Sequence, residues 1–176
     1  WFISGSEHLI PSTVQGTDFE AISVPQTFGT ATPVVTAPTS NYGKALFLNG
    51  TSNYLQLPAG AYFVGESQTY EAWVMPAKGE LPGWHRIFDF GNAPGTDNVL
   101  IAMSRVGTGW NPTFAIYRGT AVQEMPSPVP IPTGQWSHIA VTHDAISKVA
   151  IMYINGIQVA TLPNMNPPAN ITRNFC

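Results

Sequence analysis

The sequence predicts an all-β sandwich, and three observations lead to that fold class. The 16 glycines and 16 prolines are spread along all 176 residues, so they interrupt helices and produce short segments joined by turns. No stretch repeats its apolar residues at the helical period. Short apolar or β-branched segments recur instead with turn residues between them, and this spacing is typical of a sandwich or barrel rather than of βαβ units.

The expected strands follow one another from residue 45 to residue 161. Segments 45–48 and 54–57 flank the turn-rich connector 49–53 and predict a hairpin. Asn155-Gly156 is a stronger hairpin signal, because both residues tolerate the positive φ angles of a tight turn, and it joins two further strands. The remaining strands are expected at 69–75, 86–90, 99–103, 113–117, 136–142, 149–154 and 157–161.

Three segments fall outside this pattern. Residues 23–40 are rich in Ser, Thr and Pro and predict an extended arm or sheet edge, whereas 126–132 and 164–170 are too rich in Pro or Asn to be more than loops. We therefore divide the chain into an N-terminal strand and Ser/Thr/Pro-rich arm at 1–42, packed on a sandwich core at 43–176.

Large apolar side chains of the expected strands should supply most of the core. Strand 149–154 is apolar at every position, as in a strand covered on both faces. The predicted core residues are Trp73, Val74, Phe88, Trp136, Ile139, Val141, Ile151, Tyr153 and Ile154.

Composition excludes several classes of partner. Charged residues make up only 10% of the chain, against about 25% in a typical soluble domain, so hydroxyls, amides or attached sugar must cover the surface. The net charge is −3 and the seven basic residues are scattered singly, which argues against nucleic acid. No apolar run approaches the roughly 18 residues of a membrane helix, so we expect no membrane insertion. This composition favours an extracellular protein, secreted or at the cell surface.

The single cysteine, Cys176, is the last residue. No disulfide can form within the chain, so the core alone must stabilise the fold. In an oxidising compartment, an odd cysteine indicates a partner elsewhere, and in a reducing one it is a free thiol.

Residues 43–161 resemble the laminin-G-like branch of the concanavalin A-like superfamily and, more distantly, the pentraxins. The most specific stretches are GQWSHIAVT at 134–142 and YINGIQVA at 153–160. The other motifs are GKALFLNG at 43–50, YLQLP at 54–58, YEAWVMP at 70–76 and RIFDFGN at 86–92. The resemblance implies an antiparallel jelly-roll sandwich, with glycan binding, adhesion and calcium-assisted recognition as its range of functions.

Two departures from the family pattern matter. The family continues with a Gly-rich strand, an acidic loop and a final strand, whereas this chain stops at Cys176. We therefore expect a sandwich that lacks its C-terminal closing strands, with an open edge filled by further residues, by the arm 23–40 or by a strand of a neighbouring subunit. Such an edge would permit self-assembly. The disulfide of pentraxins also has no counterpart, because Ala140 stands at one of its positions.

One turn between two strands concentrates oxygen-bearing side chains. Asp89 and Asn92 precede it and Asp97 and Asn98 follow it. Calcium takes six to eight hard oxygen ligands, so this turn is the candidate calcium site. The Asp97-Asn98 pair before a strand also resembles half of the pentraxin calcium site. The alternative is that the pair forms an Asx-type turn. We expect both residues at the rim of the sandwich, close to Asp89 or Asn92.

Two further features concern sugar. Trp84, Trp110 and Tyr117 stand in or near loops, where a ring face could stack on a sugar, although packing against the core is the alternative. Asn49 and Asn170 begin Asn-x-Thr acceptor triplets for N-glycosylation.

Catalysis is not expected. Glycoside hydrolases of this superfamily place two carboxylates on one strand, and no such arrangement occurs among the expected core strands. The four histidines lack a Ser or Cys partner in any motif of nucleophilic catalysis. The leading hypothesis is a non-catalytic extracellular recognition or adhesion module that binds a glycan or a cell-surface protein. The alternative is a glycosylated structural subunit of a filament or surface appendage, and the third is a degenerate glycoside-hydrolase-like domain.

Overall fold

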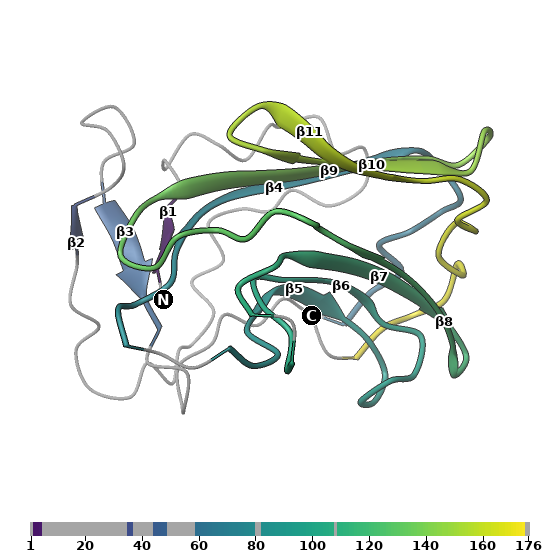
Figure 1. Cartoon of the computed structure of the whole chain (residues 1–176). Helices are drawn as coiled ribbons and strands as arrows, with labels where there is room; N and C mark the ends of the chain where they lie inside the picture. Colours follow the sequence, from purple (N-terminus) through teal and green to yellow (C-terminus); the bar gives the residue numbers. More distant parts are fainter. Residues whose placement is uncertain are drawn as a thin grey trace.

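The computed structural model describes residues 2–4, 35–36, 44–48, 59–79, 82–107 and 109–174. These residues form eleven strands in two antiparallel sheets, which face each other (Figure 1). Among them, no helix is long and apolar enough to cross a membrane. The predicted all-β sandwich is confirmed.

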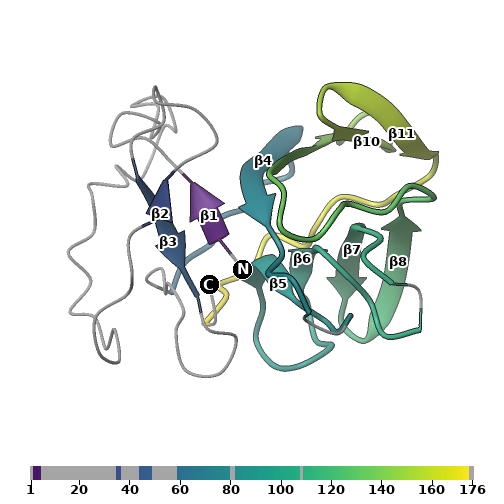
Figure 2. The same ribbon diagram turned by 60° about the vertical axis from the view of Figure 1, so that its left-hand side comes forward.

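The larger sheet has seven strands in the order β11-β10-β9-β4-β1-β3-β2. Their bounds are β1 Phe2–Ser4, β2 Val35–Thr36, β3 Lys44–Phe47, β4 Gln68–Met75, β9 Ser137–Asp144, β10 Val149–Ile154 and β11 Ile157–Leu162. The N-terminal strand β1 lies inside this sheet, paired with β4 on one side and β3 on the other. β4, β9, β10 and β11 lie over the smaller sheet, and β1, β3 and β2 extend beyond it (Figure 2).

The smaller sheet has four strands in sequence order, β5-β6-β7-β8. Their bounds are β5 Arg86–Phe90, β6 Val99–Ala102, β7 Thr113–Arg118 and β8 Ala121–Pro126. Sequence reasoning missed β8, because its residues mix polar and apolar types and end at a proline. Pro126 is tolerated there because β8 is an edge strand, where a missing N–H breaks no inner hydrogen bond.

The predicted Asn155-Gly156 hairpin is confirmed. It connects β10 to β11, and the φ angles of 51° and 78° fit a tight turn that favours these residue types. The loop predicted at 126–132 is wrong at its first residue, because Pro126 ends β8, but 127–132 and the loop predicted at 164–170 contain no strand. The hairpin turn predicted at 49–53, and strand 54–57, lie outside the described residues.

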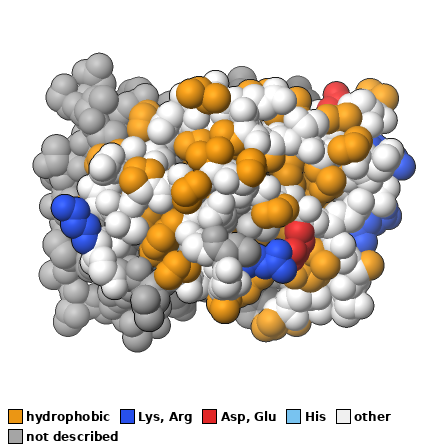
Figure 3. All heavy atoms as spheres, in the orientation of Figure 1, with side chains coloured by type: hydrophobic (Ala, Val, Ile, Leu, Met, Phe, Trp, Pro, Cys, Tyr) orange, Lys and Arg blue, Asp and Glu red, His pale blue; other side chains and the backbone are white. Residues whose placement is uncertain are grey.

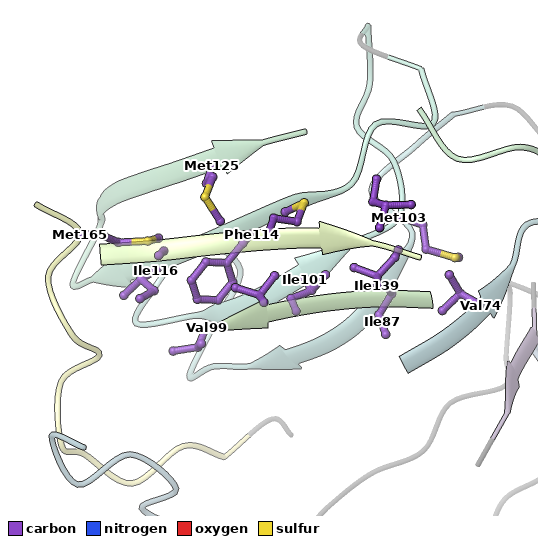
Figure 4. Close-up of a cluster of buried hydrophobic side chains, with 14 of the residues drawn as sticks. Val74, Ile87, Val99, Ile101, Met103, Phe114, Ile116, Met125, Ile139 and Met165 are labelled. Carbon is purple, nitrogen blue, oxygen red and sulfur yellow. The ribbon is translucent and has the colours of Figure 1, made fainter. Parts of the chain in front are cut away.

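The core lies between the sheets, and alternation along each strand builds it. In β9, Ile139, Val141 and His143 point inward, and their neighbours point outward. Figure 4 shows apolar side chains of both sheets gathered in one cluster. Its fully buried members include Val74, Val99, Ile101, Met103, Phe114, Ile116, Ile139, Val141, Ala150, Met152 and Met165.

Part of the predicted core is wrong. Val74, Ile139, Val141 and Ile154 are buried, and Phe88 packs against the cluster because an irregularity in β5 turns it inward beside Ile87. The other four predicted residues are half-buried and do not belong to the cluster: Trp73, Trp136, Ile151 and Tyr153. On β10 the inward positions are Ala150, Met152 and Ile154, so the two residues between them face outward. Because both faces of β10 are apolar, its sequence does not indicate which face packs against the core.

The C-terminal residues run beside the smaller sheet. Arg173 exchanges two backbone hydrogen bonds with Gly60, and the N–H of Asn174 donates to Gly91 just after β5. Each inner strand of both sheets has two hydrogen-bonded neighbours within the chain. The edges are β2 and β11 in one sheet and β5 and β8 in the other, and coverage of an edge by a further strand stays a prediction.

Candidate functional site

The outer face of the smaller sheet has a floor of small, fully buried side chains. Leu100, Ala102 and Ala115 are at most 2% exposed, although they alternate with residues that face the core. Tyr117 packs against this floor. The strand register places charged side chains over the same floor, with Asp89 opposite Leu100 and Glu124 opposite Ala115. We call this surface the charged face: Trp84, Arg86, Asp89, Asn98, Arg105, Tyr117 and Glu124.

The charges on this face are paired. Arg86 Nε donates to Asp89 Oδ2 at 3.0 Å, and Arg105 Nη1 donates to Glu124 Oε2 at 2.6 Å. These side chains remain between 20% and 35% exposed. The face therefore has no net charge from these four groups, yet it presents both donors and acceptors to solvent. On the side of the molecule shown in Figure 3, the described residues include few charged side chains.

Trp84 lies beside both arginines. The guanidinium carbons of Arg86 and Arg105 lie 4.6 Å and 5.3 Å from the centre of the Trp84 ring, within the range of cation–π attraction. The tryptophan is still 37% exposed. Gly83 anchors its position, because its N–H donates to Ser104 Oγ at 3.2 Å.

Trp110 occupies a different environment. It packs against the main core, and its ring stacks on His85 with centroids 5.1 Å apart. Of the three aromatic residues predicted to contact glycan, Trp84 and Tyr117 thus share the charged face, whereas Trp110 supports it from the core side.

The structure also pairs a serine with a histidine, which the sequence did not reveal. Ser104 Oγ lies 2.7 Å from His85 Nδ1. Ser104 is fully buried, however, and its hydroxyl donates to the carbonyl of Gly83. A buried hydroxyl in this arrangement holds the 83–85 segment in place and cannot reach a substrate.

The four predicted calcium ligands are only partly brought together. Asn98 Nδ2 donates to Asp89 Oδ1 at 2.7 Å, so these two meet as expected. Asp97 has a φ of 57° and its Oδ1 accepts the N–H of Gly119 at 2.6 Å, which directs the carboxylate toward the β7–β8 turn. Asn92 Oδ1 accepts the N–H of Asn174 at 3.2 Å.

A close approach explains the glycine in this turn. A Cβ on Gly91 would lie 2.3 Å from Asn98 Nδ2, so only glycine leaves room for the Asn98–Asp89 hydrogen bond. Both carboxylate oxygens of Asp89 accept protein donors. In the part of the chain that the structure describes, no three His, Cys, Asp or Glu side chains form a group that could hold a metal. Calcium binding stays a prediction.

Of the two predicted N-glycosylation sites, Asn170 is among the described residues. It is exposed on the loop after β11, so burial would not prevent the attachment of a sugar. Asn49 lies outside the described residues.

Arg86, Arg105 and Glu124 were missed as site residues. Each stands alone in the sequence, and only strand pairing brings the two ion pairs over one floor. Arg86 gave no signal, because residues three apart in a regular strand lie on opposite faces, and only the irregularity between Arg86 and Phe88 brings Arg86 and Asp89 to the same face. Glu124 had no signal, because its strand was not predicted.

Comparison with known proteins identifies the family. The model of the concanavalin A-like lectin/glucanases superfamily matches residues 49–175. Among solved structures, the chain is similar to domain 4 of an extracellular GH43 arabinanase from Geobacillus stearothermophilus, solved in complex with arabinotriose. The two are 26% identical with a TM-score of 0.56, and the match covers 81% of this chain and 66% of that one. No curated protein matches the chain. The chain belongs to the concanavalin A-like lectin/glucanase superfamily.

Proposed function

We propose that this chain is a non-catalytic carbohydrate-binding domain of an extracellular protein, which holds a neutral oligosaccharide on the charged face. The observation that carries the proposal is the pairing of two arginines with two carboxylates over a small-residue floor, beside an exposed tryptophan. Sugars need many directed hydrogen bonds and an apolar surface for their C–H groups, and this face offers both. The similar arabinanase domain, which was solved with arabinotriose, supports the ligand class.

The balance of charge favours an uncharged sugar. A uronic acid or sulfated glycan would need an unpaired cation, whereas Arg86 and Arg105 are each neutralised by a carboxylate. Binding of a neutral sugar should then change little between low and high salt, because no counterions are released.

The same geometry disfavours hydrolysis. Asp89 is on β5 and Glu124 is on β8, with two strands between them. At about 4.8 Å per strand spacing, these strands are about 14 Å apart. The catalytic carboxyls of glycoside hydrolases lie about 5–9.5 Å apart.

Binding to a glycan array, followed by calorimetry with arabinotriose, tests the proposal. Trp84→Ala and Glu124→Gln should each weaken binding about tenfold, since they remove an apolar surface and a charged hydrogen-bond acceptor. Ile157→Ala is the matched control, because Ile157 is 69% exposed on β11 of the other sheet. Failure to bind any carbohydrate would overturn the proposed function. Unchanged affinity in both charged-face variants would overturn its site.

A structural subunit of a filament remains the alternative. Sheet-edge strands such as β8 and β11 could accept a strand from a neighbour. Light scattering over a range of concentrations would distinguish an assembling subunit from a monomeric binding domain.

A further inference from the structure

The larger sheet carries a hollow on its outer face, on the side of the sandwich opposite the charged face. Its volume is about 510 Å³, and it lies where β4 begins, β9 ends and β10 begins. Sugar- and drug-sized ligands occupy pockets of about 300–1,000 Å³. The hollow is lined by Ser67, Gln68, Thr69, Thr142, His143, Asp144, Ser147, Val149 and Ile151.

Strand alternation gives the hollow a mixed lining. On β9 and β10 the side chains of Val141 and Met152 face the core, so Thr142 and Ile151 face outward into the hollow. Hydroxyl groups come from two serines and two threonines, and aliphatic surface comes from Val149 and Ile151. Hydroxyls both donate and accept hydrogen bonds, and branched aliphatic groups fit the C–H face of a sugar ring.

The wall of the hollow is fixed before any ligand arrives. Asp144 Oδ1 accepts the N–H groups of Ile146 at 2.9 Å and Ser147 at 2.7 Å, which closes the β9–β10 turn. Ser67 Oγ accepts the N–H of Ala145 at 3.1 Å, which ties the segment before β4 to the same turn. A preformed wall reduces the entropy lost on binding.

The charges of the lining exclude other ligand classes. Asp144 is the one acidic side chain of the lining, and no Lys or Arg lines it. An anion would meet a carboxylate and no cation, and a metal ion would find a single charged ligand. An uncharged ligand with many hydroxyls fits the lining.

An aromatic residue lies next to this hollow on the same face. Tyr153 is the next outward position after Ile151 on β10, about 7 Å further along the strand. Tyr153 is half-buried. A sugar in the hollow could therefore continue as a chain over Tyr153.

We propose that the hollow is a second carbohydrate-binding site, which takes one uncharged sugar unit. Because the charged face lies on the opposite side of the sandwich, one domain would then hold two glycan chains and bridge them. The inference rests on the ligand class of the proposed function but not on its site.

The test is an NMR titration of the ¹⁵N-labelled chain with arabinotriose and with cellotriose. Two groups of amides should shift, one around residues 67–69 and 142–151 and one around the charged face. The double variant Thr69→Val/Thr142→Val removes two hydroxyls while keeping side-chain shape. It should weaken binding in the hollow about tenfold or more and leave the charged face unchanged. Thr120→Val is the matched control, an exposed threonine between β7 and β8 of the other sheet that does not line the hollow.

The outcomes separate the two proposals. Shifts at the charged face alone, with neither sugar moving the amides of the hollow, would overturn the second site and leave the proposed function intact. Equal weakening of binding in the hollow by Thr120→Val would also overturn it. The absence of any shift, together with failure to bind a glycan array, would overturn both. A bridging domain should also aggregate beads coated with the polysaccharide it binds, and the double variant should not.

Discussion

Adjacent residues on β10 should respond to truncation in opposite ways. Met152 is fully buried in the core cluster, whereas Ile151 faces outward and lines the hollow. Truncation of a buried Met to Ala costs about 2–5 kcal/mol, because transfer free energy is lost and a cavity remains. Truncation of Ile151 removes three carbons from a half-exposed site, which at about 0.8 kcal/mol per fully buried carbon predicts a loss of about 1 kcal/mol.

These values translate into melting temperatures. For a domain of this size, 1 kcal/mol corresponds to roughly 2–4 °C. Met152→Ala should therefore lower the melting temperature by roughly 4–20 °C, and Ile151→Ala by only roughly 2–4 °C. Denaturation in guanidinium chloride should give the same order, with an unchanged m-value for both variants.

Binding provides the second measurement for the same pair. Ile151→Ala should weaken sugar binding in the hollow, and Met152→Ala should leave it unchanged at temperatures where the protein is folded. Equal losses of stability in the two variants would refute the strand-face assignment. A Met152→Ala protein that melts like the parent would refute the position of the core.

Three other changes follow from single contacts. Arg173→Met should destabilise the chain by about 1–3 kcal/mol, because the fully buried Arg173 donates to the carbonyl of Asp97 and a buried acceptor without a partner is costly. Chemical denaturation measures this, and an unchanged midpoint would contradict it. Gly156→Ala should cost about 1 kcal/mol at the β10–β11 turn, since a φ of 78° strains any residue with a Cβ, and a stabilised variant would show that the turn relaxes. The backbone N–H and then the hydroxyl of Ser147 lower the pKa of Asp144 in the folded chain, so its contribution to stability is present above the unfolded pKa and is lost as the pH falls through the folded one. Carboxyl NMR should find the pKa below its ordinary value, and Asp144→Asn should flatten the acid limb of the stability curve below about pH 4.

Much of the fold follows from local patterns. Asn155-Gly156 predicts a hairpin without any knowledge of the tertiary structure, because a two-residue hairpin turn needs positive φ angles and these two residue types tolerate them. Alternation in 137–144 likewise identifies Ile139 and Val141 as core residues, although the buried positions at either side of them, Ser137 and His143, are polar and were not identified. The family resemblance in 43–161 added the jelly-roll expectation, and the match over 49–175 confirmed the superfamily.

The faces of the sheets were decided only by tertiary structure. Strand 149–154 is apolar throughout, so its sequence is equally compatible with Ile151 inside or outside, and the packing of β9 and β4 made the choice. The charged face depends on register, because Arg105 and Glu124 meet only when β8 pairs with β7. The hollow forms where the start of β4, the end of β9, the start of β10 and the β9–β10 turn come together. Its lining thus includes residues that are almost eighty positions apart in the sequence. The types and spacing of the residues determine which side chains a strand can bury. Pairing with neighbouring strands and packing against the other sheet determine which side chains it exposes, and binding sites are formed by those exposed side chains.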